Sequence, residues 1–301
     1  MDSDALSTFI AIHRAGGFSK AADLLGRTQP AISRRIALLE DELGVPLFER
    51  ISGGVVLSQA GKVLLPHAER VAAAVRDARE AVTALASGNA GPVSLATVGT
   101  LASTHLTVVL KQFVAKFPEA QLSLQTATSD GVSDLVRRGE VSIGLRYLED
   151  PSTDLTNHAL PSEKLVVVCP PEHRFAGGRV KKLSDLRADH WLAFPKDYAH
   201  REASAENIFA QFLVRGIASI SWAPVDSLTA QKRLIEAGFG IGLLPESSVG
   251  EEIGAAMLST ISVGDLDARH PVMAIVRREG YLSAASLKLL EMLRKEFNFP
   301  Q

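Results

Sequence analysis

Hydrogen-bonding side chains gather on one short helix that we predict near the N-terminus, over residues 28–44. Helical spacing turns Ile32 and Ile36 inward and leaves three polar side chains facing outward: Gln29, Ser33 and Arg34. Glutamine can pair bidentately with adenine, arginine can pair with guanine, and Pro30 can contact a thymine methyl group. The helix therefore carries side chains suited to reading base edges in the major groove of duplex DNA.

Residues around this helix suit contacts with phosphate. Lys20, Arg35 and Arg50 can bind phosphates, which position a domain on DNA without specifying its sequence; Thr28, at the helix start, joins the candidate DNA-binding residues. Residues 1–66 hold seven basic and seven acidic side chains, so their net charge gives no indication of nucleic-acid binding. The stretch 27–35 nevertheless has three arginines and no acid. The alternative is a three-helix packing unit with an ordinary solvated face.

Three helices and a hairpin must position these side chains. The predicted helices cover 4–15, a short segment capped by Ser19 and ended by Gly26, and the segment from Thr28 to Gly44. Two short strands follow, on either side of a turn at 52–54. Three helices followed by a hairpin predict a winged helix-turn-helix.

A long helix is predicted from Ser58 to Ser87. Its apolar residues are spaced alternately by three and four, as in a heptad stripe: Leu64, Ala68, Val71, Val75, Ala78, Val82 and Leu85. Such a stripe can pack on its own domain or on a second copy of the helix. Because the flanking regions look self-contained, we favour dimerisation through Leu64, Val71, Val75, Val82 and Leu85.

The rest of the chain alternates strands and helices and predicts an α/β domain. The strands 93–98 and 121–126 each run into a polar turn before a helix, and both turns lie at the same edge of one sheet. Thr100, Leu101 and Ser103 in the first turn, and Thr128 in the second, would favour an anion at a helix N-terminus. Arg146 ends the next strand and could pair with an acidic ligand. The open alternatives are helix capping by Thr100 and Ser103, and an ion pair of Arg146 with Glu149 or Asp150.

Other chemistry is not indicated. None of the eight histidines has metal-ligand spacing, and the sequence lacks the G-x-S-x-G, H-E-x-x-H and P-loop motifs, so we expect neither an enzyme nor a metal or cofactor. Cys169 lies in an apolar strand and reads as an inert core thiol. No apolar run reaches the roughly 18 residues of a membrane span, and the N-terminus is acidic. We expect a cytoplasmic protein with no membrane partner.

The segment AADLLGRTQPAISRRIALLEDELGVPLFER, followed by VVLSQAG, resembles the N-terminal signature of LysR-type transcriptional regulators. The resemblance extends through the long helix to DLVRRGEVSIGLR and GFGIGLLP, over residues 4–299. Two positions depart from the family pattern. The turn at Gly26 and Arg27 lies where the family varies, so its base preference does not carry over; Ser58 replaces a common threonine and keeps a hydroxyl for capping.

The resemblance implies a winged helix-turn-helix, a linker helix and a two-lobed α/β effector domain like the periplasmic binding proteins. The expected limits are 1–60 for the DNA-binding domain, 58–88 for the linker and dimerisation helix, 92–161 with 268–301 for lobe 1, and 162–267 for lobe 2. A small organic effector would lie between the lobes, where Pro195, Lys196, Asp226 and Ser227 would complete the site.

The function expected is a sequence-specific DNA-binding regulator whose DNA contacts respond to this effector, through a shift between two populations. Its partners would be promoter operator DNA, the effector and a second copy of itself in a dimer or tetramer, with RNA polymerase a candidate at the promoter. Two rivals stay open: a ligand-independent architectural DNA-binding protein or repressor, and a solute-binding or enzymatic α/β domain with a helical head.

Overall fold

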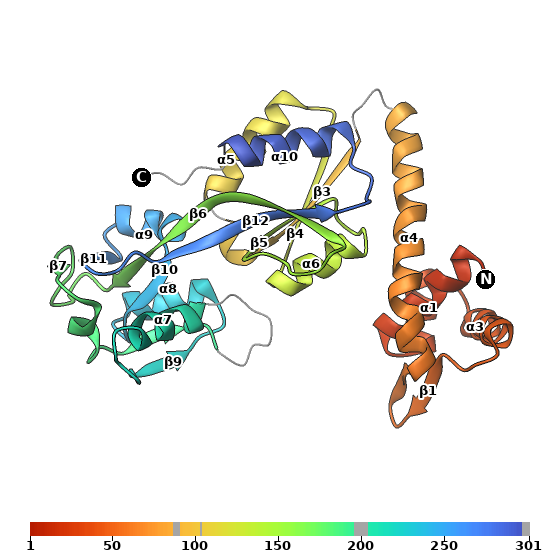
Figure 1. Cartoon of the computed structure of the whole chain (residues 1–301), viewed down its shortest axis with the longest axis horizontal. Helices are drawn as coiled ribbons and strands as arrows, with labels where there is room; N and C mark the ends of the chain where they lie inside the picture. Colours follow the sequence, from red (N-terminus) through yellow and green to blue (C-terminus); the bar gives the residue numbers. More distant parts are fainter. Residues whose placement is uncertain (87–90, 103, 196–203, 297–301) are drawn as a thin grey trace.

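The computed structural model describes residues 1–86, 91–102, 104–195 and 204–296, and it contains three parts (Figure 1). A small helical head at the N-terminus leads into one long helix, and a two-lobed α/β domain follows. The predicted fold class is confirmed. Within the described ranges, no helix is both long enough and apolar enough to cross a membrane.

The head contains the three predicted helices and the hairpin: α1 (Ser3–Ala15), α2 (Phe18–Leu25), α3 (Gln29–Leu43), β1 (Phe48–Ile51) and β2 (Gly54–Leu57). Strands β1 and β2 pair antiparallel. The head's core includes Phe9 and Ile12 of α1 and, as the spacing predicted, Ile32 and Ile36 of α3. Gly44 ends α3 in the left-handed conformation.

Of the two capping predictions in the head, that for Ser19 is wrong and that for Thr28 is confirmed in position only. Helix α2 begins at Phe18, with Gly17 rather than Ser19 as its N-cap. Phe18 lies in the first turn of α2, and its ring packs on Phe48, with ring centroids 5.7 Å apart. Thr28 does stand at the N-cap of α3, but its side chain makes no capping hydrogen bond.

Helix α4 (Gln59–Ala86) rises from the head as the long helix of Figure 1. Ser58 starts it as expected: its Oγ accepts a hydrogen bond from Gly61 N at 3.0 Å. Ala68 and Ala72 are buried in the head's core, and Leu64 packs against that core. The first part of the heptad stripe is therefore used within the head.

The α/β domain is built on an eight-stranded sheet whose main path runs β4-β3-β5-β12-β6-β11-β7. Lobe 1 holds the parallel strands β3 (Pro92–Val98), β4 (Gln121–Ala127) and β5 (Ile143–Tyr147), with the helices α5 (Thr104–Lys116), α6 (Ser129–Arg137) and α10 (Ala284–Glu296). A 3₁₀ turn, η1 (Gly99–Leu101), separates β3 from α5.

Two long antiparallel strands, β6 (Leu155–Cys169) and β12 (Arg269–Arg277), connect the lobes (Figure 1). In lobe 2 the far end of β6 pairs with β10 and β11. The other elements of lobe 2 are β7 (Arg179–Val180), η2 (Leu183–Leu186), β8 (Trp191–Ala193), α7 (Ser204–Leu213), β9 (Trp222–Pro224), α8 (Leu228–Glu236), β10 (Gly242–Pro245), η3 (Glu246–Ser248), α9 (Gly250–Gly254) and β11 (Ser259–Val263).

A buried polar cluster lies where the strands cross between the lobes. Glu163 of β6 is 0% exposed, and it accepts a hydrogen bond from the Tyr147 hydroxyl at 2.5 Å and another from the Ser247 hydroxyl. The ring of His270 lies 4.7 Å from the ring of Tyr147. Because Tyr147 belongs to lobe 1 and Ser247 to lobe 2, the carboxylate of Glu163 links the lobes.

Helix α6 packs very closely on the sheet of lobe 1. A Cβ atom at Gly144 of β5 would lie 2.6 Å from Val132 Cγ1 and 2.8 Å from Val136 Cγ2, both on α6. It would also lie 2.8 Å from Ile275 Cγ1. Glycine at this position therefore sets the distance between α6 and the sheet.

The substitution Gly144→Ala tests this packing. We expect it to lower the free energy of unfolding by about 1–3 kcal/mol, because the added methyl group overpacks the space under α6. Urea unfolding followed by circular dichroism measures the change. Gly250→Ala is the matched control, since a Cβ there meets nothing within 4 Å. Equal stability of the two variants would contradict the close packing.

The buried histidine His270 leads to a second testable prediction, on the pH dependence of stability. Burial lowers the pKa of His270 from 6.5 to about 4. Between these values the unfolded chain binds a proton that the folded chain does not, so the free energy of unfolding falls as the pH drops. Between about pH 7 and about pH 5 the free energy of unfolding of the wild type should fall by about 2 kcal/mol more than that of His270→Gln. His67→Gln, at an exposed histidine of α4, is the control; equal losses in wild type and His270→Gln would refute the assignment.

Candidate functional site

The candidate base-reading side chains share one exposed face of the head. Gln29, Pro30 and Arg34 are exposed on the first turns of α3, and Ser33 is half-buried beside them. Thr28, just before α3, is exposed as well. The face is therefore accessible to a groove of DNA, with hydrogen-bonding groups at the N-terminal end of the helix, where such helices contact base edges.

The candidate phosphate-binding residues differ in their surroundings. Lys20 on α2 and Arg50 on the wing are exposed. Arg35 is half-buried and forms an ion pair with Asp4, which also pairs with Arg27 at 3.0 Å. Asp4 thus offsets part of the positive face that the sequence places between residues 27 and 35.

A cleft of about 440 Å³ lies between the lobes. Lobe 1 lines it with the ends of β3 and β4 and their following turns, and lobe 2 lines it with the start of α8: Gly99, Thr100, Thr126, Ala127, Thr128, Phe194, Asp226, Ser227, Leu228 and Thr229. Four of the predicted effector-binding residues, Thr100, Thr128, Asp226 and Ser227, are therefore brought together from two halves of the chain.

Two helices, one from each lobe, begin at this cleft. Thr128 is the N-cap of α6 and accepts a hydrogen bond from Gly131 N at 3.1 Å. Ser227 is the N-cap of α8 and accepts from Ala230 N at 3.4 Å. Because helix N-termini carry partial positive charge and unpaired N–H groups, the two ends favour a negatively charged group between them.

Two buried hydroxyl groups of lobe 1 have no hydrogen-bond partner among the residues that the structure describes. Thr100 is 5% exposed, and its Oγ1 makes no hydrogen bond to any residue that the structure describes. The same holds for the Oγ of Ser129, the first residue of α6. Of the two residues, Thr100 lines the cleft. Since an unsatisfied buried hydroxyl is costly, its Oγ1 is available to a ligand or water. Capping of α5 by Thr100, the alternative left open from the sequence, does not occur, because Thr100 lies in η1, before α5 begins.

Arg146 does not line the cleft. It is 7% exposed, and its guanidinium forms an ion pair with Asp150 at 2.5 Å and donates to the Ser133 hydroxyl at 2.7 Å. Burial would raise the pKa of Asp150, but hydrogen bonds from Ser133 and Ser152 and the charge of Arg146 outweigh it and hold that pKa below its ordinary value. The structure therefore contains the ion pair that the sequence left open as an alternative to ligand binding.

The other candidate effector residues are placed as follows. Leu101 packs in the core of lobe 1 and does not line the cleft, because η1 turns its side chain inward. Pro195 is half-buried and also absent from the lining, although Phe194 before it contributes. Ser103 and Lys196 lie outside the described residues.

Two lining threonines were missed from the sequence. Thr126 lies two residues before Thr128, and Thr229 lies two residues after Ser227. Along a strand, alternate residues share a face, and this could have identified Thr126. Thr229 lies in the first turn of α8, so its position depends on how lobe 2 is folded against lobe 1.

The predicted dimerisation stripe is partly exposed along α4. Val71 is 41% exposed and Val82 is 68% exposed, whereas Val75 is half-buried. Leu64 packs on the head's core, and the side chain of Leu85 lies outside the described residues. Exposed valines on one helix face are suited to packing against a second copy.

Metal and thiol chemistry find no support in the described part of the chain. Its His, Cys, Asp and Glu residues form no group of three or more that could hold a metal ion. Cys169 is buried, and burial raises the pKa of its thiol to about 11, as expected of an inert core cysteine.

Comparison with protein families matches nearly the whole chain. Residues 3–62 match the bacterial regulatory helix-turn-helix protein model of the lysR family, and residues 86–298 match the LysR substrate binding domain. The transcriptional dual regulator GltC of Bacillus subtilis is 31% identical over 222 residues, which cover 73% of this chain and 73% of GltC. The regulator TcbR of a Pseudomonas species is 30% identical, over 82% of this chain and 83% of TcbR.

Solved structures agree with these matches. CbnR complexed with its target DNA is 27% identical, with a TM-score of 0.69 over 98% of this chain and 100% of CbnR. A full-length OxyR variant from Pseudomonas aeruginosa, at 19% identity, shares the fold with a TM-score of 0.74 over 99% of this chain and 94% of OxyR. Together with the two family models, these likenesses show that the chain belongs to the LysR family of transcriptional regulators, with a DNA-binding head and an effector-binding domain.

Proposed function

We propose that this regulator responds to a small organic anion, such as a carboxylate, bound in the cleft between the lobes. The observation that carries the proposal is the meeting of two helix N-termini from opposite lobes beside the hydroxyl of Thr100, which has no partner among the described residues. Thr100, Thr128 and Ser227 would supply donors to the anion, and Phe194 an apolar wall. Arg146 has no direct part in binding, since its guanidinium is engaged with Asp150 and Ser133.

The proposed DNA contacts follow from exposure on the head. Gln29, Pro30 and Arg34 read base edges, with Ser33 and Thr28 beside them. Lys20, Arg35 and Arg50 bind phosphates, and Arg35 exchanges or shares its ion pair with Asp4 when it does so.

One head reads few base pairs, so a dimer or tetramer is proposed as the working unit. Val71 and Val82 on α4 are exposed apolar side chains that a second α4 would cover. We retain the domain limits expected from the sequence, a cytoplasmic location and RNA polymerase as a candidate partner at the promoter. The proposal includes no catalytic step.

Selection of duplexes from a random library, followed by affinity measurement at one fixed salt concentration, tests the DNA-reading face. Arg34→Ala and Gln29→Ala should each weaken binding to the selected duplex by about 1–3 kcal/mol and relax sequence preference. Arg79→Ala, at an exposed arginine of α4, should keep wild-type affinity. Unchanged preference in both head variants would show that another surface reads the bases.

A thermal-shift screen against small carboxylates tests the cleft. At a hundred times its dissociation constant, a true effector should stabilise the wild-type chain by about 2.7 kcal/mol. Thr100→Val removes a buried hydroxyl that has no partner within the described ranges. It should therefore weaken binding of the effector while leaving the ligand-free protein at least as stable.

Thr156→Val is the control, because Thr156 on β6 does not line the cleft. An effector that binds Thr100→Val as tightly as wild type would place the ligand elsewhere. If no compound in a broad panel stabilises the protein, the alternative of a ligand-independent architectural DNA-binding protein or repressor would be favoured.

A further inference from the structure

Helix α6 extends from the cleft to the DNA-binding head. Its N-cap, Thr128, lines the cleft. The residues that follow its last turn, Arg138, Gly139 and Glu140, contact α4 and α1. One helix of nine residues thus has its start at the proposed ligand and its end at the head and linker helix.

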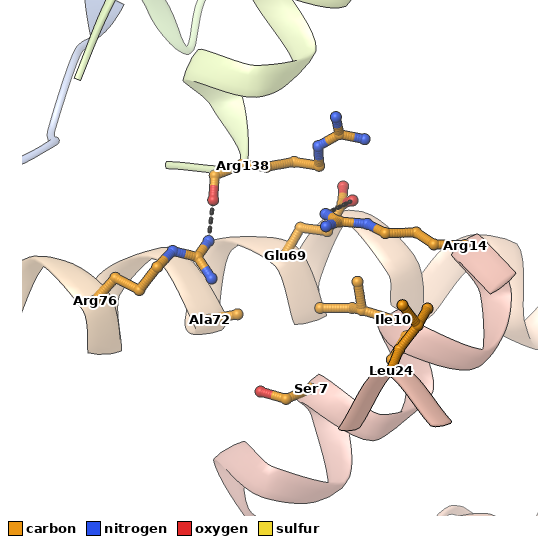
Figure 2. Close-up of a pocket in the computed structure, with 9 residues that line it drawn as sticks. Ser7, Ile10, Arg14, Leu24, Glu69, Ala72, Arg76 and Arg138 are labelled. Atoms are coloured by element: carbon orange, nitrogen blue, oxygen red, sulfur yellow. Dashed lines mark hydrogen bonds and ion pairs between the residues drawn. The ribbon is translucent and has the colours of Figure 1, made fainter. Parts of the chain in front are cut away.

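The C-terminal end of α6 is held by an arginine of the linker helix. Gly139, with φ of 66°, closes α6 in a Schellman motif, in which Glu140 N donates to Leu135 O and Gly139 N to Val136 O. The carbonyl oxygen of Arg138 accepts a hydrogen bond from Arg76 of α4 (Figure 2). The carbonyl oxygen of Gly139 accepts a second one from Arg76, at 3.3 Å. A cation at the negative end of a helix is favourable.

The same end of α6 also reaches the head directly. Glu140 forms an ion pair with Arg14 of α1 at 2.5 Å, and Arg14 lies 3.5 Å from Glu69 of α4. Beside these groups lies a cavity of about 250 Å³, lined by the head, α4 and Arg138 (Figure 2). Among the described residues, no hydrophobic cluster spans the head and lobe 1. The junction is therefore polar and incompletely filled, and such a contact can open without breaking either core.

Lobe 1 also contacts α4 at Asp77, the residue that follows Arg76. Asp77 forms an ion pair with Arg277 at 2.5 Å and accepts a hydrogen bond from Tyr281 N at 3.3 Å. A Cβ at Gly139 would lie 3.0 Å from the Arg277 guanidinium carbon and 3.1 Å from Ala73 Cβ. The end of α6, the end of β12 and α4 thus meet at one point.

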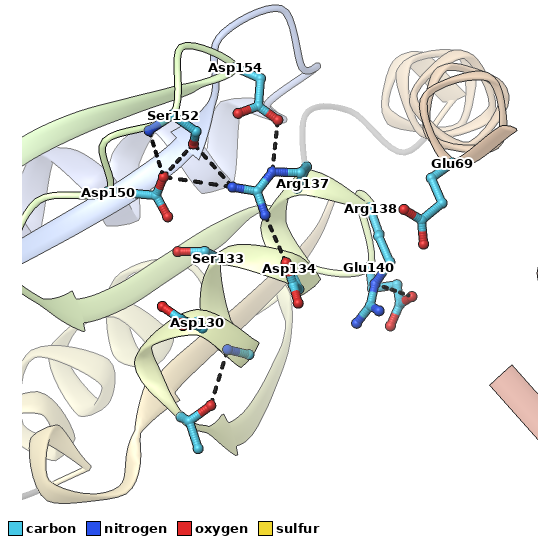
Figure 3. Close-up of polar contacts among 12 residues, drawn as sticks. Glu69, Asp130, Ser133, Asp134, Arg137, Arg138, Glu140, Asp150, Ser152 and Asp154 are labelled. Atoms are coloured by element: carbon cyan, nitrogen blue, oxygen red, sulfur yellow. Dashed lines mark hydrogen bonds and ion pairs between the residues drawn. The ribbon is translucent and has the colours of Figure 1, made fainter. Parts of the chain in front are cut away.

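Helix α6 is held on lobe 1 by polar contacts of Arg137 and by close packing of its valines on the sheet. Arg137 donates to Asp134 at 2.7 Å, to Asp154 at 2.8 Å and to Ser152 at 3.0 Å (Figure 3). Val132 and Val136 sit against Gly144, with no space for even a methyl group. These contacts hold α6 against lobe 1 as one unit, from its first turn to Arg137.

We propose that α6 and the polar junction at its C-terminal end couple the cleft to the DNA-binding head within one chain. Occupation of the cleft displaces the first turn of α6, the displacement changes the hydrogen bonds from Arg76 and the ion pair of Arg14, and the head and α4 change their angle to lobe 1. The inference rests on the proposed function of the cleft and the head, and it assigns Arg76, Arg14 and Glu140 as coupling residues.

A double-mutant cycle in the full chain tests the coupling without an identified effector. Thr128→Ala perturbs the cleft end of α6, Arg76→Ala breaks the junction, and the readout is the dissociation constant for the selected duplex. Substitutions at distant, uncoupled sites add to within about twofold. We expect Thr128→Ala to change duplex affinity when Arg76 is present and to have less effect with Arg76→Ala, a departure from additivity of more than about twofold. With Arg79→Ala in place of Arg76→Ala, the effect of Thr128→Ala should persist.

The outcomes separate the inference from the function on which it rests. If the wild type binds the selected duplex and Arg34→Ala weakens it, but the cycle is additive or Thr128→Ala has no effect, the coupling through α6 is wrong and the DNA-binding function stands. If no duplex is selected at all, the proposed function fails and the inference with it. Should Arg76→Ala not fold, two variants with less change in shape replace it: Arg76→Gln removes the guanidinium from the two carbonyl oxygens, and Glu140→Gln breaks the ion pair with Arg14. Additive behaviour in both would also overturn the inference.

Discussion

Strand β12 pairs with β5 on one side and with β6 on the other, so the last strand of the chain completes a lobe that begins at β3. The pairing forces the chain to leave lobe 1 through β6 and return through β12, and it places the cleft between the lobes. The crossing is also where Glu163 is buried under hydrogen bonds from Tyr147 and Ser247. Because a buried carboxylate is costly without such partners, these bonds hold the two lobes in register.

The parts of the molecule differ in what joins them. Within the head and within each lobe, apolar side chains are fully buried and fix the packing. Lobe 1 meets the head and α4 through arginines that contact carbonyl oxygens and carboxylates: Arg14 of the head with Glu140, Arg76 of α4 with Gly139, and Arg277 with Asp77 of α4. Partly exposed ion pairs contribute little stability each. Rigid units joined by weak polar contacts are what a regulator needs if ligand binding is to reorient its DNA-binding head.

The sequence was sufficient where local periodicity determines structure. The inward positions of Ile32 and Ile36, the wing and the strand-to-helix turns that meet at the cleft all follow from spacing. It was insufficient where a partner is chosen in three dimensions. The heptad spacing of α4 could not tell that Ala68 packs on the head while Val82 stays exposed, and Arg146 could face either the cleft or Asp150. The junction could not be foreseen, because Arg76 binds backbone carbonyls, which every residue has.

The central claim is that this polar junction fixes the head relative to lobe 1, and a distance between spin labels tests it most directly. Labels at Asp23→Cys on α2 and Lys111→Cys on α5 report that distance, since both sites are exposed and the native Cys169 is buried. Diluting the labelled chain with unlabelled chain suppresses the distances between labels on different copies of the protein. We predict one narrow distribution in this labelled chain and a broad one when Arg76→Ala and Glu140→Gln are added. The same distribution with and without those two substitutions would contradict the account.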